Sequence, residues 1–144
     1  MIHGKATEAA IAAMGVLSER YDGGEALLSA ADIAQARGLQ RPFVSKVLTD
    51  LARVGLVRSV RGPGGGFTLA RAPDQIYLYE VHDLFQRPSG DACPFGGGIC
   101  GEGESCPLHD MFAQVRAATD KILHGTTFGV FANGRADAAE SLDA

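Results

Sequence analysis

The stretch VSKVLTDLARVGLVRSVRGPGGGFTLAR, residues 44–71, decides the fold of this 144-residue chain. Its first half places apolar side chains at helical spacing. Its second half alternates like a β-strand, breaks at a run of glycines and then alternates again. We therefore predict a helix over residues 40–54, followed by a β-hairpin whose tip is the segment 62–66. A recognition helix followed by such a hairpin is typical of a winged helix.

The residues just upstream predict a partner for this helix. In LLSAADIAQARG, residues 27–38, Ser29 and Asp32 are spaced like a capping box, and Gly38 marks the C-terminal end of a short helix. Pro42 fits the first turn of the next helix, where a missing N–H costs little. Two short helices joined by a tight turn form a helix-turn-helix, whose second helix can enter a major groove of DNA.

The rest of the chain predicts further helices and one irregular segment. Helices are expected over residues 6–20, over 75–86 with Asp74 as the N-cap, and over 107–131. The fold class is therefore mainly α with a small β-wing: a winged helix-turn-helix plus a long C-terminal helix. The expected divisions are a winged-helix DNA-binding domain at 1–86, a cysteine-bearing loop at 87–106, a dimerisation helix at 107–131 and a disordered tail at 132–144.

The long helix predicts a homodimer. Its apolar residues recur at helical intervals, and a helix that extends past a small winged helix has too little domain to pack on. A second copy of the chain would cover that apolar face. Two-fold symmetry of the dimer would then match a palindromic DNA site.

Charge is distributed unevenly along the chain. The net charge is −4, yet residues 41–71 contain six Lys and Arg residues against Asp50 alone, a net of +5, so the remainder carries −9. A basic block in an otherwise acidic chain is typical of a surface that binds a polyanion, although a merely solvated basic face has the same composition. The candidate DNA-contacting residues are Arg41, Ser45 and Lys46 on the helix, Arg58 and Arg61 on the hairpin, and Gly62, Gly64 and Gly65 at its tip.

Three cysteines, Cys93, Cys100 and Cys106, lie close together in sequence, and His109 follows the last of them. Four soft or borderline ligands within such a short segment indicate a metal or iron–sulfur site. The odd number of cysteines, three, argues against a disulfide framework. Structural zinc remains an alternative, but the gaps between these cysteines lack the close C-x2–4-C pairs of most zinc sites.

The quoted stretch resembles the recognition helix and wing of Rrf2-type transcription regulators, and the order of the parts resembles that family over about residues 1–131. The resemblance implies an iron–sulfur cluster on Cys93, Cys100 and Cys106. It also implies His109 as the fourth ligand, as in the iron–sulfur-biogenesis type, or alternatively Glu8 from the N-terminal helix of a dimer partner. With a histidine ligand, we favour a 2Fe–2S over a 4Fe–4S cluster.

These features predict a DNA-binding transcription regulator that senses redox state, iron–sulfur or iron status, or nitric oxide. The alternative is a winged-helix regulator with structural zinc and a protein partner as its input. An electron-carrying enzyme component is disfavoured, because no nucleotide-binding fingerprint accompanies the wing. No signal-peptide pattern and no apolar run of membrane-helix length is present, so we expect a cytoplasmic protein without a membrane partner.

Overall fold

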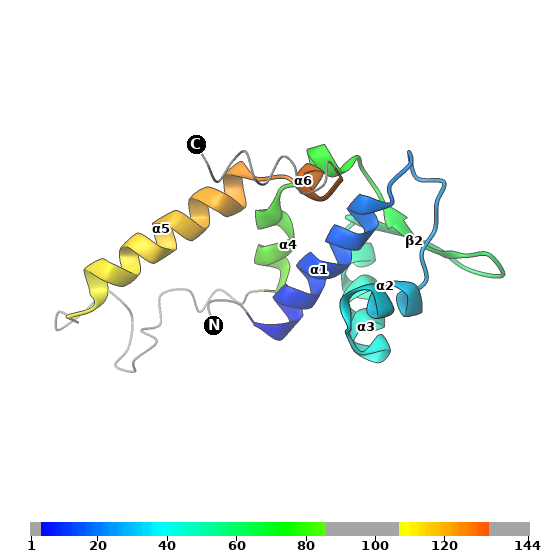
Figure 1. Cartoon of the computed structure of the whole chain (residues 1–144), viewed down its shortest axis with the longest axis horizontal. Helices are drawn as coiled ribbons and strands as arrows, with labels where there is room; N and C mark the ends of the chain where they lie inside the picture. Colours follow the sequence, from blue (N-terminus) through cyan, green and yellow to red (C-terminus); the bar gives the residue numbers. More distant parts are fainter. Residues whose placement is uncertain (1–3, 86–106, 133–144) are drawn as a thin grey trace.

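The computed structural model describes residues 4–85 and 107–132, which form a mainly helical fold with one two-stranded antiparallel sheet (Figure 1). The fold class predicted from the sequence is confirmed. The predicted cysteine-bearing loop lies outside the described residues, and so does the predicted tail apart from Ala132, which is the last residue of a short helix. The elements are α1 (Lys5–Glu19), α2 (Ala30–Arg37), α3 (Arg41–Arg53), β1 (Val57–Val60), β2 (Gly66–Leu69), the 3-10 helix η1 (Pro73–Gln75), α4 (Leu78–Phe85), α5 (His109–Gly125) and α6 (Gly129–Ala132).

The helix-turn-helix consists of α2 and α3, and its local signals act as predicted. Ser29 Oγ accepts a hydrogen bond from Asp32 N at 3.0 Å, and Asp32 Oδ2 accepts one from Ser29 N at 3.1 Å. Hydrogen bonding of the Asp32 carboxylate to Ser29, first to its side chain and then to its backbone N–H, lowers the pKa of Asp32. Gly38 ends α2 in the left-handed conformation at φ 65°. Pro42 lies in the first turn of α3, which buries an apolar stripe of Val44, Val47, Leu48 and Leu51.

The wing is the hairpin of β1 and β2, in which Val57 pairs with Leu69 and Val60 with Gly66. The chain before α2 adds a third backbone to this sheet, because Leu28 forms an antiparallel bridge with Phe67. Leu28 N donates to Phe67 O at 3.0 Å, and Phe67 N donates to Leu28 O at 2.8 Å. The wing is therefore held at its base by the segment that leads into the helix-turn-helix.

The core is built around α1, which contacts α2, α3, α4 and α6 (Figure 1). Its inner face carries small residues together with fully buried Met14, so neighbouring helices approach closely. Of the apolar positions that predicted this helix, Met14 and Leu17 are buried and Ile11 is partly buried against the same cluster. None of the helices within residues 4–85 and 107–132 is long and apolar enough to cross a membrane.

The helix predicted over residues 107–131 is divided into two. It ends at Gly125, and the next three residues run antiparallel beside Ile76–Leu78: Leu78 N donates to Thr126 O at 3.0 Å, and Phe128 N donates to Ile76 O at 2.9 Å. Glycine and two β-branched threonines in succession disfavour helix, and the extended segment places Phe128 in the core, where it is fully buried. The short helix α6 follows.

The helix predicted over residues 75–86 begins at Leu78, and Asp74 does not cap it but lies within η1. The polar group at this helix start is Glu80, whose Oε2 accepts a hydrogen bond from Tyr77 N at 2.8 Å. A glutamate at the third helical position commonly bonds back to the backbone in this way. Its Oε1 accepts a second hydrogen bond, from Arg71 Nη2, also at 2.8 Å.

Candidate nucleic-acid interface

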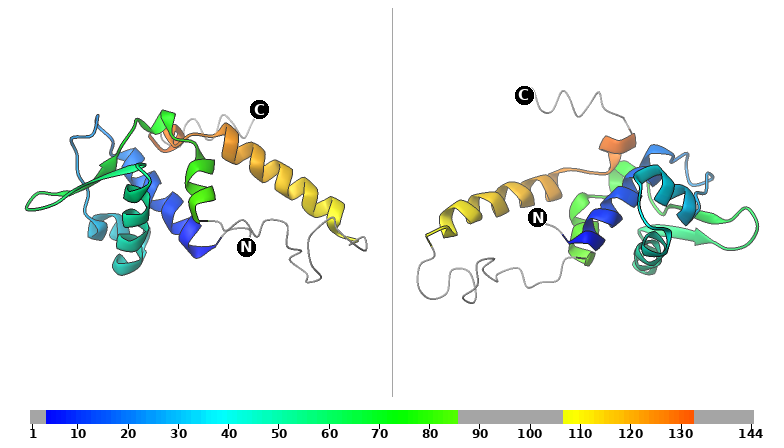
Figure 2. Two further views of the ribbon diagram at one scale, coloured as in Figure 1. Left: turned by 180° about the vertical axis from the view of Figure 1, so that it is seen from behind. Right: turned by 60° about the horizontal axis from the view of Figure 1, so that its bottom comes forward.

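The outer face of α3 presents polar side chains to solvent. The helix lies at the outer edge of the body and the wing projects beside it (Figures 1 and 2). Because its apolar stripe packs inward, Arg41 and Lys46 are exposed and Ser45 is partly buried. Thr49, one turn after Ser45, bonds back to the Ser45 carbonyl at 2.8 Å. This exposed face is the part of α3 that can enter a DNA groove.

The tip of the wing is a tight turn that requires glycine. Gly65 N donates to Gly62 O at 2.9 Å, with Pro63 and Gly64 at the two central positions and Gly64 at φ 76°, which is the pattern of a type II turn. A Cβ on Gly65 would lie 2.2 Å from Val60 O. The turn leaves Arg61 exposed beside the tip. The geometry of the turn itself therefore requires glycine, in addition to the close approach to DNA that the sequence predicts.

Three of the six basic residues in the segment 41–71 can bind a polyanion. Arg71 forms an ion pair with Glu80, and Arg53 Nη1 lies 3.9 Å from Asp50 Oδ1. By contrast, Arg41, Lys46 and Arg61 make no ion pair with any residue in the described ranges 4–85 and 107–132. The guanidinium and ammonium groups of these residues can therefore bind phosphates without first breaking an internal salt bridge.

Arg58 is placed differently from the other predicted contacts. Its Nη2 donates a 2.6 Å hydrogen bond to the carbonyl oxygen of Gly24, in the loop between α1 and α2. The sequence did not predict that this loop contacts the wing. The signal was the turn sequence Asp22-Gly23-Gly24, but nothing local indicated that it would reach β1.

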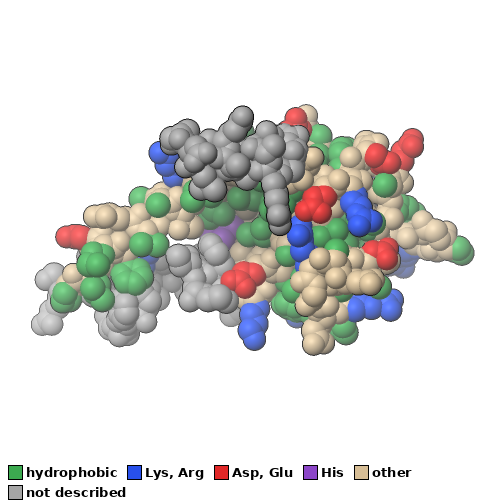
Figure 3. Space-filling model, viewed as in Figure 1, with side chains coloured by type: hydrophobic (Ala, Val, Ile, Leu, Met, Phe, Trp, Pro, Cys, Tyr) green, Lys and Arg blue, Asp and Glu red, His purple; other side chains and the backbone are tan. Residues whose placement is uncertain are grey.

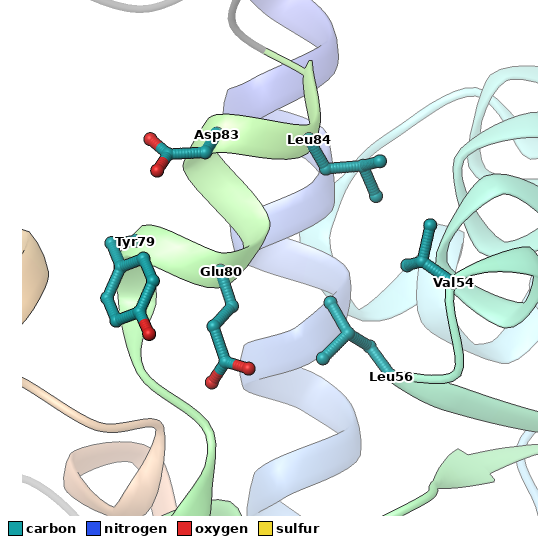
Figure 4. Close-up of a pocket in the computed structure, with 6 residues that line it drawn as sticks. All are labelled: Val54, Leu56, Tyr79, Glu80, Asp83 and Leu84. Atoms are coloured by element: carbon teal, nitrogen blue, oxygen red, sulfur yellow. The ribbon is translucent and has the colours of Figure 1, made fainter.

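A shallow groove on another side of the body is unsuited to nucleic acid. It encloses about 460 Å³ between the end of α3 and α4 and is lined by Val54, Leu56, Tyr79, Glu80, Asp83 and Leu84 (Figure 4). Its ionisable groups, apart from Tyr79, are carboxylates, which would repel phosphates. Burial alone would raise the pKa of Glu80, but the hydrogen bonds from Arg71 and Tyr77 N and the charge of Arg71 together lower it.

The predicted metal ligands are only partly within the described chain. Cys93, Cys100 and Cys106 lie outside it. His109 is the first residue of α5 and partly buried, and Glu8 is exposed in the first turn of α1. Within residues 4–85 and 107–132, no three His, Cys, Asp or Glu side chains gather as a metal ion would need.

Together, the helix-turn-helix, the glycine-tipped wing and the exposed basic side chains define a winged-helix DNA-binding protein. Residues 3–134 match the Rrf2 family, described as an iron-dependent transcriptional regulator. The chain belongs to the Rrf2 family. This membership confirms the prediction of a transcription regulator rather than an enzyme.

Individual relatives agree with this assignment. A protein of Aquifex aeolicus (strain VF5), provisionally named an HTH-type transcriptional regulator, is 33% identical over 108 residues, or 70% of this chain and 72% of that protein. The HTH-type transcriptional regulator IscR of Cronobacter sakazakii (strain ATCC BAA-894) is 30% identical over 105 residues. That match covers 73% of this chain but 65% of the IscR protein, so the chain spans less than two thirds of that relative.

Two solved structures share the fold. The structure of T. potens IscR has a TM-score of 0.71 at 22% identity and covers 94% of this chain and 88% of its own. The structure of CymR, the global cysteine regulator of B. subtilis, has a TM-score of 0.71 at 23% identity. The match covers 90% of this chain and 95% of the CymR chain. At such identities the likeness shows the fold alone. Because CymR is described as a cysteine regulator, membership in the family does not by itself define the signal to which this chain responds.

Proposed function

We propose that this chain is a homodimeric regulator that binds a palindromic DNA operator through α3 and the wing, and whose DNA affinity responds to an iron–sulfur cluster. The observation that carries the DNA-binding part is a set of exposed basic side chains on two adjacent elements, Arg41, Lys46 and Arg61, which form no ion pair within the part of the chain that the structure describes. In this proposal, Arg41, Ser45 and Lys46 enter the major groove. Arg61 and the tip glycines Gly62, Gly64 and Gly65 follow the sugar-phosphate backbone.

The homodimer is supported by the surface of α5. This helix projects from the body, and hydrophobic side chains gather over its outer end (Figures 1 and 3). Its exposed apolar residues Met111, Val115 and Ile122, together with Leu108 directly before the helix, follow helical spacing along one face. Such a stripe in water favours pairing with a second copy, because the two stripes then bury each other.

The cluster is supported by the chemistry of its donors. Three thiolates and an imidazole suit iron–sulfur ligation, and His109 begins α5 three residues after Cys106. We assign Cys93, Cys100, Cys106 and His109 as ligands, with Glu8 as the alternative fourth ligand and a 2Fe–2S cluster favoured. The bound cluster would supply sensitivity to redox state, iron supply or nitric oxide. The protein's own part is to hold it at the outer end of α5, whose other end is anchored in the winged-helix core.

The first experiment tests the DNA interface. A duplex selected from a random DNA pool by the full-length protein is titrated by fluorescence anisotropy over a series of KCl concentrations. Lys46→Met should weaken binding and reduce the slope of log affinity against log salt concentration by about 1.8, because each of the two protomers loses one cation that neutralises a phosphate. The matched control is Lys121→Met, an exposed lysine on α5, which should leave both values unchanged. Equal behaviour of the two variants would contradict the interface.

The second experiment tests the cluster. Protein purified without oxygen is analysed for iron and sulfide and by Mössbauer spectroscopy. One nitrogen-ligated iron in a 2Fe–2S cluster, lost in His109→Ala, supports His109, whereas a signature lost in Glu8→Ala supports the alternative ligand. Colourless protein that contains zinc would contradict the cluster and favour the structural-zinc regulator. If Cys93→Ala removes the cluster without changing DNA affinity, the coupling between cluster and DNA binding fails.

A further inference from the structure

Arg58 belongs to the basic segment of the chain, but its side chain points to a neighbouring loop. It lies on β1 directly opposite Thr68 of β2, and its Nη2 donates to Gly24 O at 2.6 Å. Thr68 is almost fully buried, at 2% exposure, although it belongs to a two-stranded wing. Residues directly opposite in an antiparallel pair share one face of the sheet. The Arg58 side chain therefore lies on the face that Thr68 occupies and connects that face to the loop.

The loop that accepts this hydrogen bond has its own internal order. Asp22 Oδ1 accepts hydrogen bonds from Glu25 N at 3.0 Å and from Ala26 N at 2.7 Å. Gly23 and Gly24 adopt φ values of 91° and 98°, which turn the chain sharply and aim the Gly24 carbonyl outward. An aspartate that bonds to backbone N–H groups in this way closes a turn.

The loop is joined to the wing at two points. One is the pair of backbone hydrogen bonds between Leu28 and Phe67, and the other is the bond from Arg58 to Gly24. Leu28 directly precedes Ser29, the N-cap of α2. The two attachments therefore connect the wing to the start of the helix-turn-helix, in addition to the chain connection between α3 and β1.

We propose that Arg58 is a positioning residue of the DNA interface: its bond to Gly24 fixes the wing against the loop that leads into α2. The wing tip with Arg61 is thereby held at a set position relative to Lys46 on α3. A mobile wing would have to be ordered on binding, and that entropy cost would lower affinity. This inference rests on the proposed α3–wing interface, and it differs from a direct phosphate contact by Arg58.

Salt dependence separates the two roles of Arg58. Each phosphate contact releases counterions and adds about 0.9 to the slope of log affinity against log salt concentration. Loss of a positioning hydrogen bond from a charged donor should instead weaken binding about tenfold at every salt concentration and leave the slope unchanged. Arg58→Met tests this, because the methionine keeps an apolar stem over Thr68 but donates no hydrogen bond. Arg61→Met, on the same wing, should reduce the slope.

Substitution of Asp22 gives an independent test. A purely electrostatic effect and a positioning role predict changes in DNA affinity of opposite sign. Removing a carboxylate near a polyanion raises affinity if charge alone matters. If the loop positions the wing, Asp22→Ala should lower affinity about fivefold to tenfold, since two backbone hydrogen bonds are lost. Asp22→Asn keeps Oδ1 as an acceptor and should bind at least as tightly as the wild type. The double variant Arg58→Met/Asp22→Ala should bind no more weakly than the weaker single variant, because both act through one loop.

The measurements use the full chain, the selected duplex and circular dichroism melting to verify folding. Parallel salt slopes for the wild type and Arg58→Met, with reduced affinity for Asp22→Ala, support the positioning role. A slope for Arg58→Met that falls like that of Arg61→Met, or an affinity gain in Asp22→Ala equal to that in Asp22→Asn, overturns it. If Lys46→Met and Arg61→Met both leave affinity and slope unchanged, the α3–wing interface itself is wrong, which is a separate outcome.

Discussion

Phe128 N donates a hydrogen bond to Ile76 O at 2.9 Å, and both side chains are fully buried. Phe128 follows the projecting helix α5, whereas Ile76 precedes α4, so the two residues join distant parts of the described chain. The ring of Phe128 also stacks on that of Phe131 in α6, with centroids 5.8 Å apart. The base of α5 is therefore built into the winged-helix core.

We expect Phe128→Ala to destabilise the winged helix, although this residue lies far from α3 in sequence. Truncation of a fully buried phenylalanine costs about 3–5 kcal/mol, because transfer free energy is lost and a cavity remains. The measurement is the free energy of unfolding from urea denaturation. Val130→Ala is the control: this residue lies two positions after Phe128, in α6, but is exposed, so its effect should stay within about 0.5 kcal/mol. Equal effects of the two substitutions would show that Phe128 is not part of the core.

The glycine at the end of the wing turn is expected to be essential for DNA binding but not for folding. A Cβ on Gly65 would lie 2.2 Å from Val60 O, so Gly65→Ala must displace the tip. The tip is at the surface, so the free energy of unfolding should fall by no more than about 1–3 kcal/mol, while DNA affinity falls at least about tenfold. Gly125→Ala is the control, since nothing lies within 4 Å of its added Cβ. Wild-type affinity in Gly65→Ala would show that the tip does not contact DNA.

The exposed stripe on α5 predicts a dimer that a buried charge should dissociate. Met111 is 62% exposed and Ile122 is 58% exposed, which is unusual for large apolar side chains on one helix face. A glutamate at either position would be buried without a partner in the dimer, at a cost of several kcal/mol. We therefore expect Met111→Glu and Ile122→Glu to be monomers by sedimentation equilibrium. Gln114→Glu, on an exposed polar position of α5, should remain a dimer. A dimer in all three variants would exclude α5 as the interface.

The sequence predicted what short-range chemistry controls. The capping box of Ser29 and Asp32, the left-handed Gly38 and the apolar stripe of α3 each depend on residues within a few positions, and each is found in the structure. The bridge between Leu28 and Phe67, the bond from Arg58 to Gly24 and the burial of Phe128 join residues far apart in sequence. No pattern within a short stretch of sequence indicates which distant residues will meet. For the same reason Asp74 was the wrong choice of cap: Arg71 and Tyr77 together hold Glu80 at the start of α4.

The ion pair between Arg71 and Glu80 makes the free energy of unfolding depend on pH in the acid range. Because the pKa of Glu80 is lowered in the folded state, its stabilising effect is fully present above the unfolded pKa, near 4.5, and is lost as pH falls through the folded value. Arg71 and Glu80 are 43% and 23% exposed, so we expect Glu80→Gln to cost about 1 kcal/mol at neutral pH. The difference in free energy of unfolding between the wild type and Glu80→Gln should shrink below about pH 4.5. Urea denaturation across pH measures it, with the exposed Glu25→Gln as control. A difference that persists unchanged at low pH would show that Glu80 acts through packing and not through its charge.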